Sequence, residues 1–166
     1  MLKFLLPLVI ISFLSINTYA ENTFNDAEEF VKYFSDSAID ILSDNNINEE
    51  EKFDLFTNLV MSSIDLELIS KFVLSKAWKT ASDSQKEEYI KVFEKYFINS
   101  YANKLNQYSG EQVEIFGSED SGKYIIVDSN IIKDGTDTLK INIKWRLLNK
   151  NGNFKIIDLN IEGISL

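Results

Sequence analysis

The sequence predicts an α+β fold, in which N-terminal helices pack on one face of a curved four-stranded antiparallel sheet. Apolar residues recur three and four positions apart as far as Gly110, which is the spacing of an amphipathic helix. Beyond Gly110 they alternate with polar residues, which is the spacing of a half-buried strand. Helices that all precede the strands favour a sheet covered on one face over an alternating α/β fold.

The helical part contains four recognisable helix starts. The first helix is expected over residues 24–42. Asn48 predicts the start of a second helix, because its side chain can cap and three glutamates follow it. Asp65 is expected to cap a short third helix, and Ser82 with Gln85 forms a capping-box pattern before the longest one.

The second part of the chain contains four expected strands, at residues 112–116, 123–132, 138–148 and 154–164. The third is the clearest, because Ile143 and Trp145 alternate with Lys144 and Arg146. The Asn151–Gly152 pair after it predicts a tight hairpin turn. The strands should therefore form a meander.

Residues 1–20 have the pattern of a secretory signal peptide. Lys3 supplies the positive charge, an apolar run of 13 residues follows from Phe4 to Ile16, and Ala20 closes a small-residue cleavage pattern. This run is too short to span a bilayer. We therefore expect an exported, soluble chain with a single domain over residues 21–166.

Histidine and cysteine are both absent from the sequence. The commonest general base, the commonest metal ligand and the thiolate nucleophile are therefore missing, so we expect no catalytic residue, no metal site and no cofactor. The chain also carries a net charge of −9 at pH 7. Phosphate backbones and anionic headgroups repel such a chain, so nucleic acid is not an expected partner and a membrane surface is a poor one.

Three segments resemble the MlaC family of periplasmic phospholipid-binding proteins, also known as the toluene-tolerance or ABC-transporter auxiliary type. They are residues 65–78, which include Asp-Leu-Glu-Leu-Ile and Ala-Trp, residues 81–110, which carry an aromatic helix, and residues 155–166, which form the closing strand. The resemblance extends from about residue 26 to Leu166, and the stretch from Asp158 onward is its most specific part.

This resemblance implies an NTF2-like or cystatin-like scaffold with a deep apolar pocket for phospholipid acyl chains. It implies a Gram-negative periplasmic carrier that moves phospholipid between an outer-membrane lipoprotein–porin complex and an inner-membrane ABC transporter, where an MCE-domain protein is the dock. Such a carrier maintains outer-membrane lipid asymmetry, and phospholipid is its cargo. Family members usually continue with a further helical segment, whereas this sequence ends at Leu166, so either the gene is shorter or the chain is truncated.

The same resemblance assigns lipid-binding positions on both halves of the chain. On the helices they are Phe72, Val73, Trp78, Tyr89, Phe93, Phe97 and Tyr101, and on the sheet they are Ile143, Trp145, Leu159 and Ile161. Ordinary core packing is the alternative for each of them. The lipid headgroup is expected to stay in solvent, so that no fixed cationic clamp is required.

Two rival functions remain open. An NTF2-like scaffold can host an enzyme, with Asp65 or Asp158 as base and Tyr89 or Tyr101 as donor. A catalytic carboxylate would then need a raised pKa and a place in the cavity. The other rival is a ligand-free periplasmic adaptor, which predicts a solid core and no bound lipid.

Overall fold

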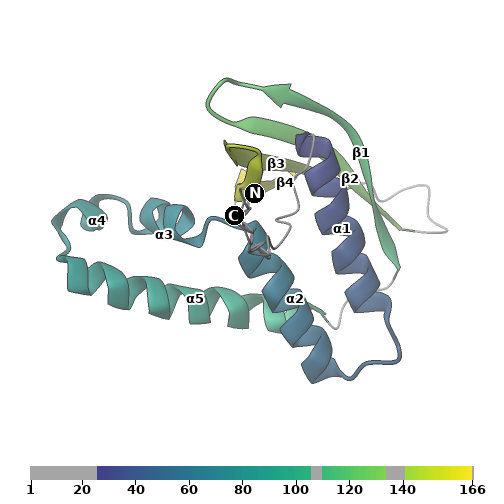
Figure 1. The fold of residues 1–166 in the computed structure, drawn as a ribbon, viewed down its shortest axis with the longest axis horizontal. Coiled ribbons are helices and arrows are strands. Elements are labelled where there is room, and N and C mark those ends of the chain that lie inside the picture. The colour runs from purple at the N-terminus through teal and green to yellow at the C-terminus, as the bar shows by residue number, and fades with distance from the viewer. Residues whose placement is uncertain (1–25, 106–109, 134–140, 166) are drawn as a thin grey trace, which may run out of the picture.

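The computed structural model describes residues 26–105, 110–133 and 141–165 of the 166-residue chain. Within these residues, five helices precede one antiparallel sheet, and this arrangement confirms the predicted α+β fold (Figure 1). The predicted signal peptide lies outside the described residues. The helices are α1 Ala27–Ser43, α2 Glu49–Ser63, α3 Leu66–Leu74, α4 Lys76–Thr80 and α5 Asp83–Leu105.

Side-chain caps mark where α1, α2, α3 and α5 begin, and three of these caps were predicted. Asn48 Oδ1 accepts a hydrogen bond of 2.9 Å from the backbone of α2, and Asp65 Oδ1 accepts one of 3.0 Å from the backbone of α3. Ser82 and Gln85 exchange the two hydrogen bonds of a capping box at 2.9 and 3.2 Å. The cap of α1 is Asp26, so this helix begins at Ala27, later than the start at residue 24 that the helical spacing of apolar residues predicts.

The short helix α4 was not predicted. It follows directly on α3 because Ser75 adopts φ 52° and ψ −120°, which interrupts the helical hydrogen bonding after Leu74. In Figure 1, α3 and α4 run above α5, and the three helices extend together to one side of the sheet. They form an arm with one end next to the strands.

The sheet is a meander in the order β1-β2-β3-β4-β5. Its strands are β1 Glu111–Asp120, β2 Ile125–Lys133, β3 Ile141–Lys150, β4 Asn153–Ile161 and β5 Ile164–Ser165. Asn151 and Gly152 have φ 57° and 88°, which confirms the predicted hairpin turn. The two-residue β5 is additional to the four predicted strands, and it forms because Glu162 and Gly163, with φ 51° and 87°, reverse the chain.

Two bulges bend the sheet, one near Ile115 in β1 and one at Ile157 in β4. Helix α1 packs on the inner face of this curve, where Phe30 contacts Phe154 with ring centroids 6.0 Å apart and Phe34 meets Trp145 edge to face at 5.7 Å. The buried core is a cluster of Ala27, Phe30, Val31, Ile64, Val127, Ile143, Trp145, Leu147, Phe154 and Ile156.

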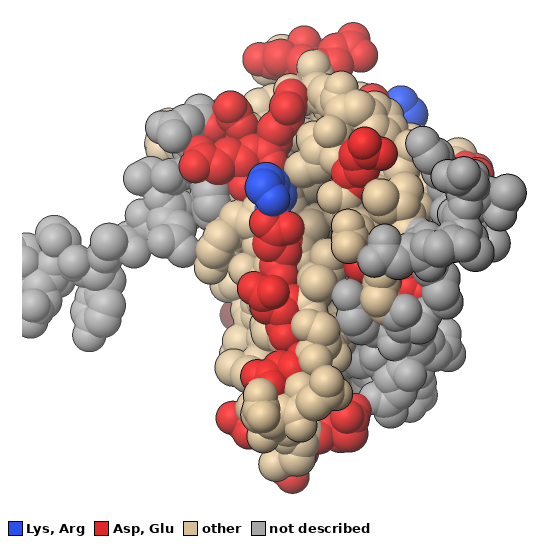
Figure 2. Space-filling view, turned by 90° about the vertical axis from the view of Figure 1, so that its right-hand side faces the viewer, with Lys and Arg blue, Asp and Glu red and all other residues tan. Residues whose placement is uncertain are grey.

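The outer side of α1 is strongly acidic. Figure 2 shows a column of acidic side chains down this side of the molecule. Between Asp26 and Asp54 there are ten acidic and two basic residues, so this segment carries eight of the nine net negative charges of the chain. The rest of the sequence is close to neutral.

Candidate functional site

An open apolar groove lies between the arm and β4. Its volume is about 290 Å³, and we call it the main groove. Helices α3 and α5 form one wall and the edge of β4 forms the other. It is lined by Ile64, Ile69, Val73, Phe93, Tyr96, Phe97, Ser100, Ile156, Ile157, Asp158 and Leu159.

The link between α2 and α3 positions this groove. Ile64 forms a parallel bridge with Ile156 of β4, and the backbone N–H of Asp65 donates to the Ile156 carbonyl at 2.9 Å. The first turn of α3 is therefore fixed beside the edge of the sheet. Beyond it, α3 continues along the arm and faces α5, which leaves the space between helices and strand unfilled.

Large apolar side chains lie exposed along the groove. Phe72 is 65% exposed, Val73 is 60% exposed and Tyr96 is 68% exposed. On α5 an aromatic row continues inward, with ring centroids 5.7 Å apart for Tyr89 and Phe93 and 6.2 Å apart for Phe93 and Phe97. Contiguous exposed apolar surface beside a groove is typical of a site that an apolar ligand covers.

A smaller cavity of about 140 Å³ adjoins the main groove, and we call it the side cavity. It shares four lining residues with the main groove, namely Ile69, Val73, Ile157 and Asp158. It adds Phe72, Tyr124, Arg146 and Ser165, so its far end is polar. The apolar groove therefore continues towards charged side chains.

The structure brings five of the predicted lipid-binding residues together at these two cavities. Val73, Phe93, Phe97 and Leu159 line the main groove, and Phe72 lines the side cavity. Tyr89 belongs to the aromatic row beside them. These positions are those expected of an acyl-chain site, and their contact with lipid stays a prediction.

The other predicted residues lie elsewhere. Trp78 is in α4, where the ammonium groups of Lys71 and Lys86 lie 5.4 and 5.8 Å from its ring. Ile143 and Trp145 lie in the packed core under α1, and the Trp145 indole N–H donates to Ser129 Oγ at 2.8 Å. Ile161 packs at the margin of that core. The side chain of Tyr101 lies outside the described residues.

Sequence reasoning missed several lining residues, although some carried a signal. Ile64, Ile69 and Tyr96 have the helical spacing of apolar residues in the sequence, so their place in the groove wall could have been inferred. Ile156 and Ile157 are adjacent and both line the groove, which strict strand alternation forbids. The bulge that permits it has no signature in the sequence.

The carboxylates near the groove serve structural roles. Burial raises the pKa of Asp65, but hydrogen bonds from Lys150 and the Leu68 backbone, with the charges of Lys150 and Lys71, outweigh it and leave the pKa below its ordinary value. Asp158 accepts from Arg146 Nη1 at 3.0 Å and from Ser165 Oγ at 2.6 Å.

Burial raises the pKa of the Tyr89 hydroxyl, so this group stays protonated at neutral pH. Among the described residues, no group of three or more His, Cys, Asp or Glu side chains is placed to hold a metal ion. Nor does any helix in the described ranges have the length and hydropathy needed to cross a membrane.

Known proteins resemble this chain in sequence and in fold. The intermembrane phospholipid transport system binding protein MlaC of Haemophilus influenzae is 30% identical over 112 residues, which are 66% of this chain and 52% of that protein. The chain thus spans about half the length of that relative. A phospholipid-binding protein from Ralstonia solanacearum, solved in complex with a phospholipid, has a TM-score of 0.70 at 20% identity and matches 84% of this chain and 80% of its own.

The family model described as MlaC protein matches residues 32–166, which include every element that builds the main groove. The segments that carry the sequence resemblance fall within this match. This chain belongs to the MlaC family.

Proposed function

We propose that this protein is a carrier that holds the acyl chains of a phospholipid in the main groove and does no chemistry on them. The observation that carries the proposal is the open apolar groove flanked by exposed Phe72, Val73 and Tyr96. Two relatives support it, because the Haemophilus influenzae protein is named for phospholipid transport and the Ralstonia solanacearum protein was solved with a phospholipid.

The energetics of an acyl chain agree with a carrier. Each methylene removed from water gains about 0.8 kcal/mol, so a chain of about 16 carbons gains about 12 kcal/mol on entering an apolar groove. A bilayer already offers the chain the same dry environment. Exchange between membrane and groove is therefore close to neutral in free energy, and the direction of transport must come from partners or from ATP.

The charged groups around the groove argue against the enzyme alternative. A general base in an apolar site needs a raised pKa, whereas the partners of Asp65 hold its pKa below the ordinary value. Asp158 has both oxygens engaged, one by Arg146 and one by Ser165. Binding without reaction requires only shape and apolar surface, which the main groove provides.

We also propose where the carrier works. Removal of residues 1–20 as a signal peptide would place one domain, residues 21–166, in the periplasm. The proposed exchange partners are an inner-membrane MCE-domain protein of an ABC transporter and an outer-membrane lipoprotein–porin complex. The name of the Haemophilus influenzae relative, which refers to an intermembrane transport system, supports this placement. Co-purification with each partner from a periplasmic and membrane extract tests it.

The groove is tested with two matched valine variants. Val73 and Val92 are 60% and 59% exposed on helices, but only Val73 lines the main groove and the side cavity. Val73→Asp and Val92→Asp should therefore change the free energy of unfolding equally little, by about 0.5 kcal/mol or less. Only Val73→Asp places a carboxylate against the acyl chain.

Native mass spectrometry with lipid extraction is the measurement, on mature protein purified from the periplasm. We expect the wild type and Val92→Asp to carry a mass increment of a diacyl phospholipid, and Val73→Asp to lose it. A wild type that purifies without lipid and takes none up from vesicles would support the ligand-free adaptor instead. Equal lipid retention by both variants would move the site away from the main groove.

A further inference from the structure

A third cavity, of about 280 Å³, lies on the other face of the sheet, and we call it the charged cavity. It is lined by Ile126, Lys144, Arg146, Asp158 and Asn160. Arg146 and Asp158 also line the side cavity, which in turn shares Val73 and Ile157 with the main groove. The three cavities are therefore neighbours, and the paired side chains of Arg146 and Asp158 stand between the side cavity and the charged cavity.

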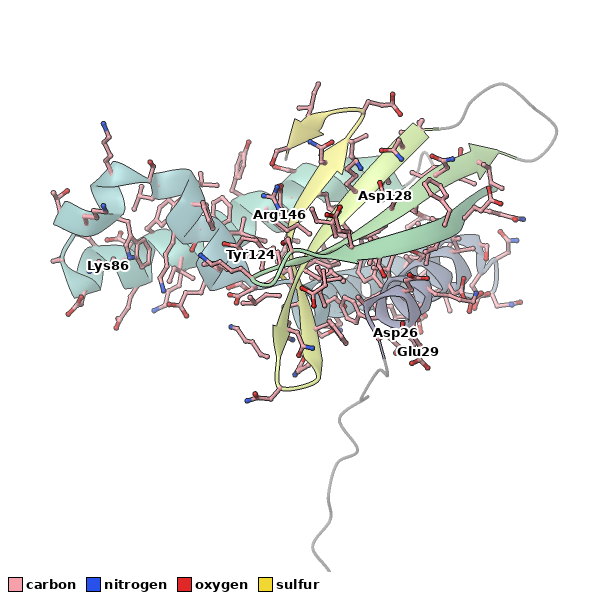
Figure 3. All side chains as sticks on the ribbon, turned by 90° about the horizontal axis from the view of Figure 1, so that it is seen from above. Asp26, Glu29, Lys86, Tyr124, Asp128 and Arg146 are labelled. Carbon is pink, nitrogen blue, oxygen red and sulfur yellow. The ribbon has the colours of Figure 1, made fainter. Side chains whose placement is uncertain are left out.

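The alternation of β3 places the charges on this face. Trp145 points into the core against Phe34 of α1, so Arg146 and Lys144 on either side of it point the opposite way. Figure 3 shows Arg146, Tyr124 and Asp128 on the side of the strands away from α1. The charged cavity is thus separated by the sheet from the acidic outer side of α1.

Arg146, the only arginine in the sequence, is held in one orientation. Its Nη1 donates to Asp158 at 3.0 Å, and its guanidinium carbon lies 5.9 Å from the centre of the Tyr124 ring. The Asp158 carboxylate is itself fixed by Ser165. The Arg146 side chain nevertheless remains 47% exposed, so part of its five-donor fork is accessible to a ligand.

Each cation that lines this cavity is paired with a carboxylate, although only Asp158 of the two carboxylates lines it. Lys144 Nζ lies 2.8 Å from Asp128 Oδ1, so a second cation–carboxylate pair stands next to the pair of Arg146 and Asp158. The two carboxylates oppose a ligand with a net negative charge. A ligand that carries both signs close together gains from both pairs.

We propose that the charged cavity binds the headgroup of a zwitterionic phospholipid, with the phosphate against Arg146 and Lys144 and the ammonium against Asp158. This assignment rests on the proposed function, because it requires acyl chains in the main groove. It adds a headgroup site to a carrier whose sequence alone required no cationic clamp. Phosphatidylethanolamine has the required pair of charges, and phosphatidylglycerol lacks the ammonium.

The test uses vesicles with equal amounts of phosphatidylethanolamine and phosphatidylglycerol that have identical acyl chains. Native mass spectrometry then gives the ratio of the two lipids bound. Lys91 is an exposed lysine of α5 that lines none of the three cavities, so Lys91→Gln is the control. We expect the wild type and Lys91→Gln to be enriched in phosphatidylethanolamine. In Arg146→Gln we expect about tenfold weaker binding of both lipids, because the phosphate of each loses a charge-assisted hydrogen bond, while phosphatidylethanolamine stays enriched.

Arg146→Gln also leaves Asp158 without its cation, so the double variant Arg146→Gln/Asp158→Asn provides a second version with balanced charge. It should melt close to the wild type and lose the enrichment, because the carboxylate that faces the ammonium is gone. Hexadecanol, which has the acyl carbons and no charged group, should bind equally to all variants. Hexadecanol binding to the wild type separates the two proposals, because its absence would contradict the carrier itself.

Two outcomes would overturn the headgroup site. The first is an unchanged lipid affinity in Arg146→Gln or an unchanged lipid ratio in the double variant. The second is that glycerophosphoethanolamine, which has the headgroup without acyl chains, binds to the wild type as tightly as the intact lipid. The charged cavity would then be a site for soluble phosphodiesters, independent of the main groove.

Discussion

Asp65 joins the groove wall to the sheet, and its replacement is the most quantitative test of how the groove is built. One carboxylate oxygen caps α3 through the Leu68 N–H at 3.0 Å, and the other accepts from Lys150 Nζ of β3 at 2.6 Å. Its backbone N–H is bonded to Ile156 of β4. Removing the carboxylate therefore weakens the first turn of α3 where it meets the strands.

The magnitude follows from the two contacts. Loss of an N-cap costs about 1 kcal/mol, and an ion pair to an exposed lysine such as Lys150 adds about 0.5 to 1 kcal/mol. Asp65→Ala should therefore lower the free energy of unfolding by about 1.5 to 2 kcal/mol, which is about 5 °C in Tm. Asp65→Asn keeps an oxygen that can cap α3, so it should lose only about 0.5 to 1 kcal/mol.

The pH dependence has a definite sign. Burial raises the pKa of Asp65, but Lys150, the Leu68 N–H and Lys71 together lower it by more than burial raises it. The pKa of Asp65 is therefore lower in the folded protein than in the unfolded chain. The charge of Asp65 then stabilises the fold fully above its ordinary pKa, at about pH 4. This contribution disappears as the pH falls through the folded pKa. The difference in the free energy of unfolding between wild type and Asp65→Asn should accordingly be largest at neutral pH and disappear in acid.

Urea unfolding followed by circular dichroism, at pH 7 and at steps down to about pH 3, measures both effects. Equal losses for Asp65→Ala and Asp65→Asn would show that the cap contributes nothing. A difference between wild type and Asp65→Asn that persists in acid would show that the Lys150 pair is not its source. Either result would refute this account of how α3 is anchored.

Two further predictions concern the core under α1. Leu147→Ala, at a fully buried site, should lower the free energy of unfolding by about 2 to 5 kcal/mol in urea titrations, and a smaller loss would mean that the core collapses around the deletion. Ser129→Ala should cost about 1 to 3 kcal/mol, because the Trp145 indole N–H loses its acceptor. In a double-mutant cycle with Trp145→Phe the two losses should not add, and strict additivity would contradict this hydrogen bond.

The helices and the meander were predictable because their signals are local. A cap such as Asn48 acts within one turn, and the Asn151–Gly152 turn is specified by two residues that accept positive φ. The break at Ser75 was not predictable, because nothing about a serine requires φ 52°. The same holds for β5, which depends on a chain reversal after Ile161.

The candidate site was only partly predictable, because periodicity identifies buried faces without saying what covers them. Val73, Phe93 and Trp145 all occupy apolar faces in the sequence. In the structure the first two line the main groove, whereas Trp145 is covered by α1. The difference arises from the way α3 leaves the edge of β4, which is set by tertiary contacts rather than by any local pattern.

The distribution of charge explains how the proposed carrier, although acidic, can present an apolar groove to an anionic membrane. Eight of the nine net negative charges lie between Asp26 and Asp54, while all lining residues of the main groove come from Ile64 onward. Repulsion by an anionic surface therefore acts mostly on the side formed by α1 and the first turns of α2. As the protein approaches an anionic surface, this repulsion turns it so that the arm and the edge of β4 face that surface. A lipid would enter between these two elements.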